Sequence, residues 1–206
     1  LMEQYVVASK RNQEIDYLLK ITNLDVENED QKKLIETFLE ISSMLLWAEA
    51  SFCFKCDIKS GDFDPLTIFL INKDTNDKDE IENDFLKEKF EFLNILFETD
   101  KTIKYSNFLN EIRKINPRYE YLNFSYLFPL KVDSEERYIF WFTFPKQTEF
   151  GQDTIELIER GLLKLGIKIQ KYKSKQLIFE NYKKLKDMKS QLIQSEKMAS
   201  LGTSSA

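Results

Sequence analysis

The fold is decided by one stretch, Phe124-Ser-Tyr-Leu-Phe-Pro-Leu-Lys-Val132, followed by Asp133-Ser-Glu-Glu136 and Arg137-Tyr-Ile-Phe-Trp-Phe-Thr-Phe144. In both outer runs bulky apolar side chains occupy every second position, and this period of two is typical of β-strands. The short polar segment between the runs has the composition of a turn. The stretch therefore predicts two antiparallel strands joined as a hairpin, with the carboxylates of Glu135 and Glu136 in solvent.

The elements around this hairpin alternate between strand and helix patterns. Upstream, two short apolar strands follow a helix and are separated by turn chemistry at Gly61–Pro65. Downstream, helical periodicity continues for about fifty residues without proline, far beyond the ~11–12 residues of an average helix, which predicts a coiled coil. The expected helices are 5–24, 34–47, 81–96, 107–115 and 150–201, and the further strands are 51–58, 66–71 and 101–105.

This order of elements predicts an α+β domain, in which helices flank an antiparallel sheet. Three short strings make the sequence resemble the GAF family of sensory domains over residues 25–170. They are Ala48-Glu-Ala-Ser51 at the first helix-to-strand junction, Ser125-Tyr-Leu-Phe-Pro-Leu130 in a strand, and Phe150-Gly-Gln-Asp153 at the start of the last helix. The resemblance implies a GAF-like antiparallel sheet flanked by helices, with long coiled-coil helices at the N- and C-terminal ends.

The GAF resemblance also implies a pocket on one face of the sheet, which in some members holds a cyclic nucleotide, a bilin, a haem or another small ligand. The candidate lining residues are Phe52, Phe54, Phe128, Phe140 and Phe142. Alternatively these rings only fill the core, because alternating aromatic residues are ordinary in packed sheets. The chain contains no histidine, which excludes a histidine-ligated haem within it, and no cofactor is expected beyond an unidentified small ligand.

The C-terminal string Ser195-Glu-Lys-Met-Ala-Ser-Leu-Gly202 resembles the stretch leading into the dimerisation and phosphoacceptor helix of bacterial sensor histidine kinases. This resemblance implies a signalling helix at 1–24, a GAF-like sensor at 25–170, and a coiled-coil linker into the dimerisation helix at 171–206. The expected function is sensory input to a two-component kinase module that lies beyond this chain. We expect no enzyme here; ATP, Mg²⁺ and the response regulator would bind the parent kinase.

Two apolar stripes predict the seam along which the last helix pairs in parallel with its counterpart in a homodimer, and the first stripe is expected to pack on the sheet before it reaches the partner helix. Between the stripes two three-residue steps through Lys175 predict local overwinding of the coil. Such a coil either switches between two registers or is a passive stalk. The predicted seam residues are Ile158, Leu162, Leu165, Ile169 and Tyr172 in the first stripe and Ile178, Asn181, Leu185, Met188 and Leu192 in the second.

The first helix carries its own narrow apolar stripe. Ile15 and Leu18 lie on one side with Leu19 beside them, and Arg11 and Thr22 complete that side. A stripe on an otherwise polar helix needs a partner. We expect this helix to pack beside the last helix or beside the last helix of its dimer mate.

Cys53-Phe-Lys-Cys56 is the one string with redox or metal potential. In an extended strand, residues three apart point to opposite faces, so the two sulfurs would diverge. Because the chain has no further cysteine and no histidine, a four-ligand zinc site cannot be completed, and no metal is expected. We interpret both as buried free thiols. A thiol redox sensor is the weaker alternative, and a ligand-free interaction and dimerisation module is the other.

The charge distribution argues against nucleic acid and anionic membranes as partners. A net charge of −5 from 30 basic and 35 acidic residues, interspersed along the chain, gives no basic surface for nucleic acid or anionic membranes. No run approaches the ~18 apolar residues of a membrane span. We therefore expect a cytoplasmic location, with any attachment of the parent kinase to a membrane made through regions outside this chain.

Overall fold

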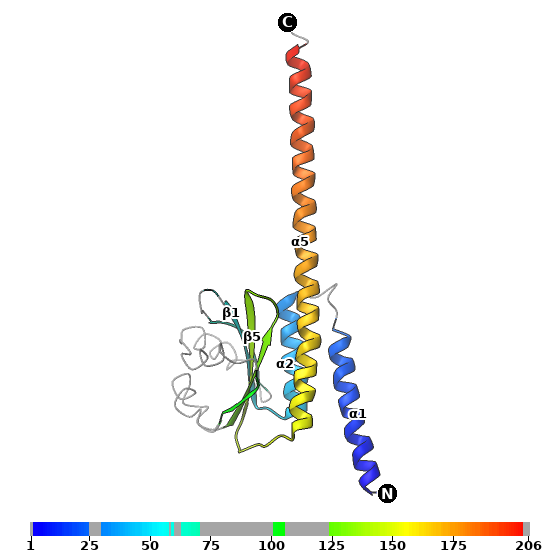
Figure 1. Cartoon of the computed structure of the whole chain (residues 1–206), viewed down its shortest axis with the longest axis vertical. Coiled ribbons are helices and arrows are strands. Elements are labelled where there is room, and N and C mark those ends of the chain that lie inside the picture. The colour runs from blue at the N-terminus through cyan, green and yellow to red at the C-terminus, as the bar shows by residue number, and fades with distance from the viewer. Residues whose placement is uncertain are drawn as a thin grey trace.

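The computed structural model describes residues 2–24, 30–57, 59, 63–70, 101–105 and 124–203. The helices expected at 81–96 and 107–115 lie outside these residues. Figure 1 shows a domain built around one end of a long helix whose other end projects alone. The elements are helices α1 (Met2–Thr22) and α2 (Gln31–Leu46), strands β1 (Ala50–Asp57), β2 (Phe63–Leu70), β3 (Ile103–Tyr105), β4 (Phe124–Lys131) and β5 (Glu136–Phe144), and helix α5 (Gln152–Thr203).

The described strands form one antiparallel sheet in the order β2-β1-β5-β4-β3. The predicted hairpin is confirmed as β4 and β5, with Phe128 opposite Phe140 and Leu130 opposite Tyr138. Strand β5 also pairs with β1 along its length, where Cys53 lies opposite Phe140. The hairpin therefore provides the centre of the sheet, and the first two strands extend it on one side.

Strand β2 corrects the expected turn at Gly61–Pro65, because the strand begins at Phe63 and includes the proline. Pro65 pairs with Phe54, and the register shifts between Cys53 and Phe54. A proline has no N–H to donate to a neighbouring strand, so sheets accept it at bulges and in outer strands. Strand β2 is outermost among the described strands, which satisfies this condition.

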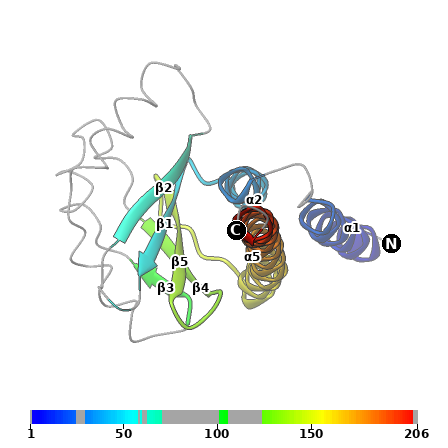
Figure 2. The same cartoon turned by 90° about the horizontal axis from the view of Figure 1, so that it is seen from above.

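The helices lie in layers on one face of the sheet. Helices α2 and α5 cover the sheet, and α1 lies on the far side of α5 (Figure 2). Helix α2 starts at Asp30, whose carboxylate accepts a hydrogen bond from the Lys33 amide at 2.8 Å, a standard N-terminal cap. It ends at Trp47, which adopts the left-handed conformation with φ of 55°. Its apolar side packs on the sheet, with the Phe38 and Phe140 rings 5.1 Å apart.

Helix α1 runs alongside α5, as expected, but through a different stripe. Tyr17 and Ile21 are buried, as is Leu24 just after the helix; of the predicted stripe, Leu18 packs against the core, whereas Ile15 and Leu19 are exposed. The Tyr17 hydroxyl hydrogen bonds with Ser42 at 3.0 Å, and its ring fills the space left by a glycine of α5, Gly161. The stripe was wrong at Ile15 and Leu19, because the sequence could not show that Tyr17 would be matched to a missing side chain on the neighbouring helix.

Candidate output site where the long helix leaves the domain

Helix α5 has a buried end and a free end. Ile158, Leu162, Leu165 and Ile169 are buried in the core of the domain, and Tyr172 packs against that core. From Ser174 to Ala199 every side chain is exposed. The prediction that the first stripe packs on the sheet is therefore confirmed, whereas its assignment to the seam of a coiled coil is wrong, since those five side chains pack within their own chain.

The overwinding predicted at Lys175 concerns the paired coil and stays a prediction. Helix α5 is continuous through this point. At about 100° per residue, Ile178 lies about 120° around the helix from Tyr172. The change of phase therefore marks a change of face: the first stripe faces the core, and the second stripe faces away from it.

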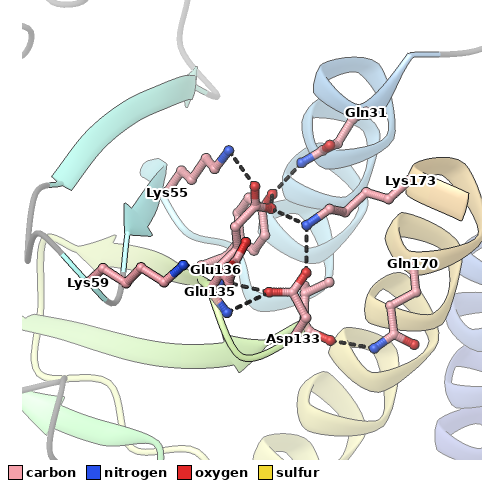
Figure 3. A network of polar contacts seen from close by, with 10 residues as sticks. Gln31, Lys55, Lys59, Asp133, Glu135, Glu136, Gln170 and Lys173 are labelled. Carbon is pink, nitrogen blue, oxygen red and sulfur yellow. Dashed lines mark hydrogen bonds and ion pairs between the residues drawn. The ribbon is translucent and has the colours of Figure 1, made fainter. Parts of the chain in front are cut away.

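A cluster of polar side chains holds α5 at the point where it leaves the sheet (Figure 3). Its centre is Lys173, whose Nζ lies 2.5 Å from Asp133 Oδ2 and 3.0 Å from Glu136 Oε2. One turn earlier on the helix, Gln170 donates a hydrogen bond to the carbonyl of Val132. We call Asp133, Glu136, Gln170 and Lys173 the hairpin clamp, because they fasten the β4–β5 turn to α5.

The turn itself places the first carboxylate of the clamp. Asp133 Oδ1 accepts hydrogen bonds from the backbone amides of Glu135 and Glu136, each at 2.8 Å. This Asp-turn arrangement fixes the side chain by its own backbone. The other oxygen, Oδ2, is left facing Lys173. Local turn chemistry thus orients a contact to a residue forty positions away in the sequence.

The second carboxylate of the clamp connects three further elements. Glu136 Oε1 lies 2.7 Å from Lys55 Nζ of β1, and Glu136 Oε2 accepts a hydrogen bond from the Tyr138 hydroxyl at 3.1 Å. Gln31, at the start of α2, donates to the same hydroxyl. The prediction that both turn glutamates are solvated is therefore wrong for Glu136. It holds for Glu135, whose carboxylate is exposed and lies 2.5 Å from the exposed Nζ of Lys59.

The opposite charges of the clamp stabilise its contacts. Burial acts to raise the pKa of Asp133, but the hydrogen bonds from Lys173 and from two backbone amides outweigh it and lower this pKa to about 2. Burial likewise opposes ionisation of Glu136, and Lys55 and Lys173 together lower its pKa. The pKa of Lys173 is raised, because its two carboxylates outweigh the effect of burial. All three groups are therefore ionised near neutral pH.

Strand β5 links this clamp to both faces of the sheet. Glu136, Tyr138 and Phe140 point to the helices, whereas the intervening Arg137 and Ile139 point to the opposite face, as the pairing requires. Burial, reinforced by the charge of Glu136, raises the pKa of Tyr138, so its hydroxyl stays protonated and can donate to Glu136. A change on either face of the sheet that displaces β5 would therefore also move the clamp, because Glu136 belongs to this strand.

The five predicted pocket residues are not brought together. Phe128, Phe140 and Phe142 lie on the helix face and belong to the main core, with the rings of Phe128 and Phe142 5.7 Å apart. Phe52 and Phe54 lie on the other face around Trp141, at ring distances of 4.9 and 6.3 Å. Since all five are buried and they lie on both sides of the sheet, they cannot line one common pocket.

A cleft of ligand size lies elsewhere, between the β3–β4 edge and the first turns of α5. Its volume is about 770 Å³. Two polar contacts join residues that line it. Lys104 Nζ lies 2.8 Å from Glu149 Oε1, and the Thr102 hydroxyl donates a hydrogen bond to Glu159 of α5. Sequence reasoning missed it, because its residues come from segments whose proximity no local pattern reveals. It is lined by Lys101, Thr102, Lys104, Tyr126, Pro129, Leu130, Lys131, Glu149, Phe150, Gln152, Ile155, Glu159, Leu162 and Leu163.

The two cysteines lie as the strand geometry predicted. Cys53 is in the core beneath the helices, and Cys56 is opposite Arg137 on the other face; both are buried free thiols. Burial raises the pKa of Cys53, which disfavours the reactive thiolate. Among the described residues, no group of three or more histidine, cysteine, aspartate or glutamate side chains could hold a metal ion. Nor does any described helix have the length and apolarity needed to cross a membrane.

The second predicted stripe, Ile178, Asn181, Leu185, Met188 and Leu192, lies wholly on the free end of α5. Its four apolar members are all 63–70% exposed. A row of large apolar side chains in solvent is uncommon on a monomer and marks an interaction surface. Its assignment as a dimer seam stays a prediction.

Comparisons with known proteins identify the fold. No protein-family model matches the sequence, and no curated protein matches it significantly. Many solved structures do share its architecture. One is the GAF domain of a protein assigned as a sensor histidine kinase from Pseudomonas syringae pv. tomato. It superposes with a TM-score of 0.59 at 7% identity, covering 86% of this chain and 99% of that chain.

Two further structures come from other kinds of protein. The GAF domain of a phosphoenolpyruvate-protein phosphotransferase from Coxiella burnetii has a TM-score of 0.58 at 14% identity, covering 80% of this chain and 97% of its own. The phycocyanobilin-bound GAF domain of a cyanobacterial phytochrome has a TM-score of 0.56 at 11% identity, covering 77% and 94%. Identities this low establish architecture alone, so the conclusion is that this chain has the GAF fold.

Proposed function

We propose that this chain is the sensory input and dimerisation region of a cytoplasmic two-component sensor histidine kinase. One observation carries the proposal: α5 is a single helix from Gln152 to Thr203, with one end inside the GAF-fold core and the other free. The resemblance of Ser195–Gly202 to the segment before a kinase phosphoacceptor helix adds to it. The phosphoacceptor, the ATP and Mg²⁺ site and the response regulator would belong to the parent kinase beyond this chain.

The clamp supplies the step between sensing and output. A change at the sheet that shifts β5 would move Glu136 and Asp133 together, since Glu136 is the first residue of this strand and Asp133 lies in the turn just before it, hydrogen-bonded to the Glu136 amide. Lys173 and Gln170 would follow, turning α5 about its axis relative to the domain. Because packed side chains resist gradual deformation, two discrete rotations are favoured over a continuous range. The free end would carry that rotation to the kinase module.

The parallel homodimer of the proposal uses the free end of α5. Paired helices turn a rotation of each helix into a change of register or separation, which a lone helix could not do. The exposed apolar row Ile178, Leu185, Met188 and Leu192 provides the surface. Asn181 in the same row favours pairing in a defined register, at some cost in stability.

The proposed stimulus is an unidentified small ligand. The cleft beside α5 is the better candidate site, because its volume of about 770 Å³ falls within the range of small-molecule pockets and the five predicted phenylalanines do not share a cavity. A ligand there would touch α5 directly at Glu159 and Leu163. Thermal-shift screening of metabolites tests this part, since a ligand that binds the folded state raises the melting temperature.

The decisive experiment changes the phase of α5 in the parent kinase. Insertion of one alanine after Ser174 rotates the free end by about 100° relative to the domain, whereas insertion of seven residues restores the face to within about 20°. We expect the single insertion to change kinase activity at least about fivefold relative to the wild type. The variant with seven inserted residues should keep the wild-type response to stimulus. Equal activity and equal response in both variants would contradict the relay.

A ligand-free interaction and dimerisation module is the second candidate. The observation in its favour is that Phe140, Phe142 and Trp141 are fully buried on both faces of the sheet, which leaves no described cavity between them. In that case the domain would hold the dimer together without a stimulus. Native mass spectrometry of the purified chain that detects a retained small molecule would favour the sensor; insensitivity of kinase output to every ligand that binds would favour the module.

A further inference from the structure

We propose that the dimer seam begins inside the GAF-fold domain, at Leu163 and Ile167, and that its occupant is the same surface of a second copy of this chain. This inference rests on the proposed function, in which α5 is the dimerisation helix. Leu163 is 65% exposed and Ile167 is 66% exposed, whereas their neighbours Leu162 and Leu165 are at most 3% exposed. Leu163 and Ile167 therefore form a further apolar side at the domain end of α5, distinct from the sides that pack against the sheet and against α1.

The helix geometry places this outer surface in line with the free end. Ile167 and Ile178 are eleven residues apart, which is about three full turns, so they share one side. From Ile167, steps of four and three residues continue past the point where α5 leaves the sheet. That spacing is the heptad pattern of paired helices. The uninterrupted series is Ile167, Lys171, Ser174, Ile178, Asn181, Leu185, Met188, Leu192, Ser195 and Ala199.

The pattern itself selects a second copy as the occupant. A spacing of 3.5 residues keeps a stripe facing one partner only when two helices supercoil around each other. In a parallel pairing each seam residue meets its own counterpart, so Asn181 would meet Asn181. Paired asparagines satisfy each other's hydrogen bonds in an apolar seam, whereas a staggered pairing leaves them opposite Ile178 or Leu185.

The area of this surface is close to what a stable dimer needs. The large apolar side chains on this side are Leu163, Ile167, Ile178, Leu185, Met188 and Leu192, and each is at least 63% exposed. At roughly 100 Å² apiece, their burial would remove roughly 600 Å² of apolar surface from each chain, approaching the ~800 Å² per partner of a standard interface. Without Leu163 and Ile167 the apolar area would be about one third smaller.

The consequence concerns the cleft. Leu163 lines the cleft and also lies on the proposed seam. If the second copy packs against Leu163, its helix lies beside one wall of the cleft. Occupancy of the cleft and the packing of the dimer would then share a side chain, so the two domains of a dimer would respond together.

Disulfide crosslinking tests where the seam begins. Ile167→Cys and Asn181→Cys lie fourteen positions apart, which is two heptads, so both occupy the same seam position. Gln176→Cys is the matched control, since it is exposed and lies about 140° around the helix from Asn181. The native thiols are buried in all three variants. Under mild oxidation we expect both seam variants to form about fivefold more covalent dimer than the control.

The outcomes separate this inference from the proposed function. Crosslinking at Asn181→Cys without crosslinking at Ile167→Cys would overturn the inference and leave the coiled-coil dimer standing. Crosslinking at neither position would overturn both. A second variant removes dependence on disulfide geometry: Ile167→Glu should raise the dimer dissociation constant about tenfold, whereas Gln176→Glu should leave it unchanged. Wild-type dimerisation of Ile167→Glu would also overturn the inference.

Discussion

The buried end and the free end of α5 carry the same kind of apolar repeat and use it in opposite ways. At the buried end, Leu165 and Ile169 are completely covered by the sheet and the other helices. At the free end, Leu185 and Met188 are exposed. The comparison teaches that helical periodicity identifies an apolar face and does not identify what covers it. One end contributes to folding of the single chain; the other can contribute only when a second molecule is present.

The largest expected difference between the two ends is in the stability of the single chain. Leu165→Ala should lower the free energy of unfolding by about 2–5 kcal/mol, because it leaves a cavity in a packed core. Leu185→Ala is the matched control and should change it by less than about 0.5 kcal/mol, since the side chain is exposed in the monomer. Urea unfolding at protein concentrations too low for dimerisation measures both. Equal losses would remove the distinction between the ends.

A pair of glycines gives the next largest effect at the buried end. In Gly161→Ala the new Cβ would lie 2.9 Å from ring carbons of Tyr17, closer than real contacts allow, so the Tyr17 ring or α1 itself must shift. In Gly166→Ala the nearest atom is Leu130 Cδ1 at 3.1 Å, at the tip of a flexible side chain. We expect Gly161→Ala to destabilise by about 1–3 kcal/mol, whereas Gly166→Ala should be within about 1 kcal/mol of neutral, because better helix propensity offsets crowding.

Circular dichroism melts of the two glycine variants measure this prediction, and limited proteolysis should show earlier cleavage of α1 in Gly161→Ala alone. If Gly161→Ala is as stable as Gly166→Ala, then Tyr17 does not hold α1 against α5.

The clamp lies at the boundary between the buried end and the free end of α5. Its loss should affect how firmly α5 is held against the turn more than it affects the free energy of unfolding. Lys173→Met should cost about 1 kcal/mol or less, because partly exposed ion pairs contribute little. Amide hydrogen exchange should nevertheless accelerate around 170–175, where α5 loses its fastening to the turn. Lys183→Met, on the exposed free end, is the control and should change neither quantity. Unchanged exchange at 170–175 in Lys173→Met would contradict the role of the clamp.

The smallest effect is a dependence of the clamp on pH. The pKa of Asp133 is lowered to about 2 in the folded chain. Because a lowered carboxyl pKa stabilises the fold only while the group is ionised, its contribution is complete above the unfolded value of about 4 and is lost as pH falls toward 2. NMR titration should find the Asp133 pKa well below 4 in the wild type and closer to 4 in Lys173→Met. An unchanged pKa in the variant would show that Lys173 is not its partner.

The sheet was predictable because its signals are local. The alternation through Tyr138, Phe140 and Phe142 indicates a strand whatever surrounds it, and the acidic turn before it closes a hairpin. Pro65 was misplaced in a turn because tolerance of proline depends on whether the strand is outermost, which is a property of the assembled sheet.

The site was less predictable because its contacts join distant segments. Glu136 looked like a solvated turn residue, and nothing near it in sequence indicates Lys55 or Lys173. The same limit applies to the first seam stripe, where Ile158 and Leu162 have the spacing of a coiled coil and the burial of a core. The free stripe was found correctly as an apolar row, since no other part of the described chain covers it.

Sedimentation equilibrium of the whole chain tests most directly that α5 serves its own domain at one end and a second molecule at the other. We predict a concentration-dependent mass reaching twice 24.6 kDa, and a return to 24.6 kDa with unchanged circular dichroism of the domain when Leu185 and Met188 are both replaced by Glu. A wild-type chain that remains at 24.6 kDa up to high micromolar concentration would contradict it.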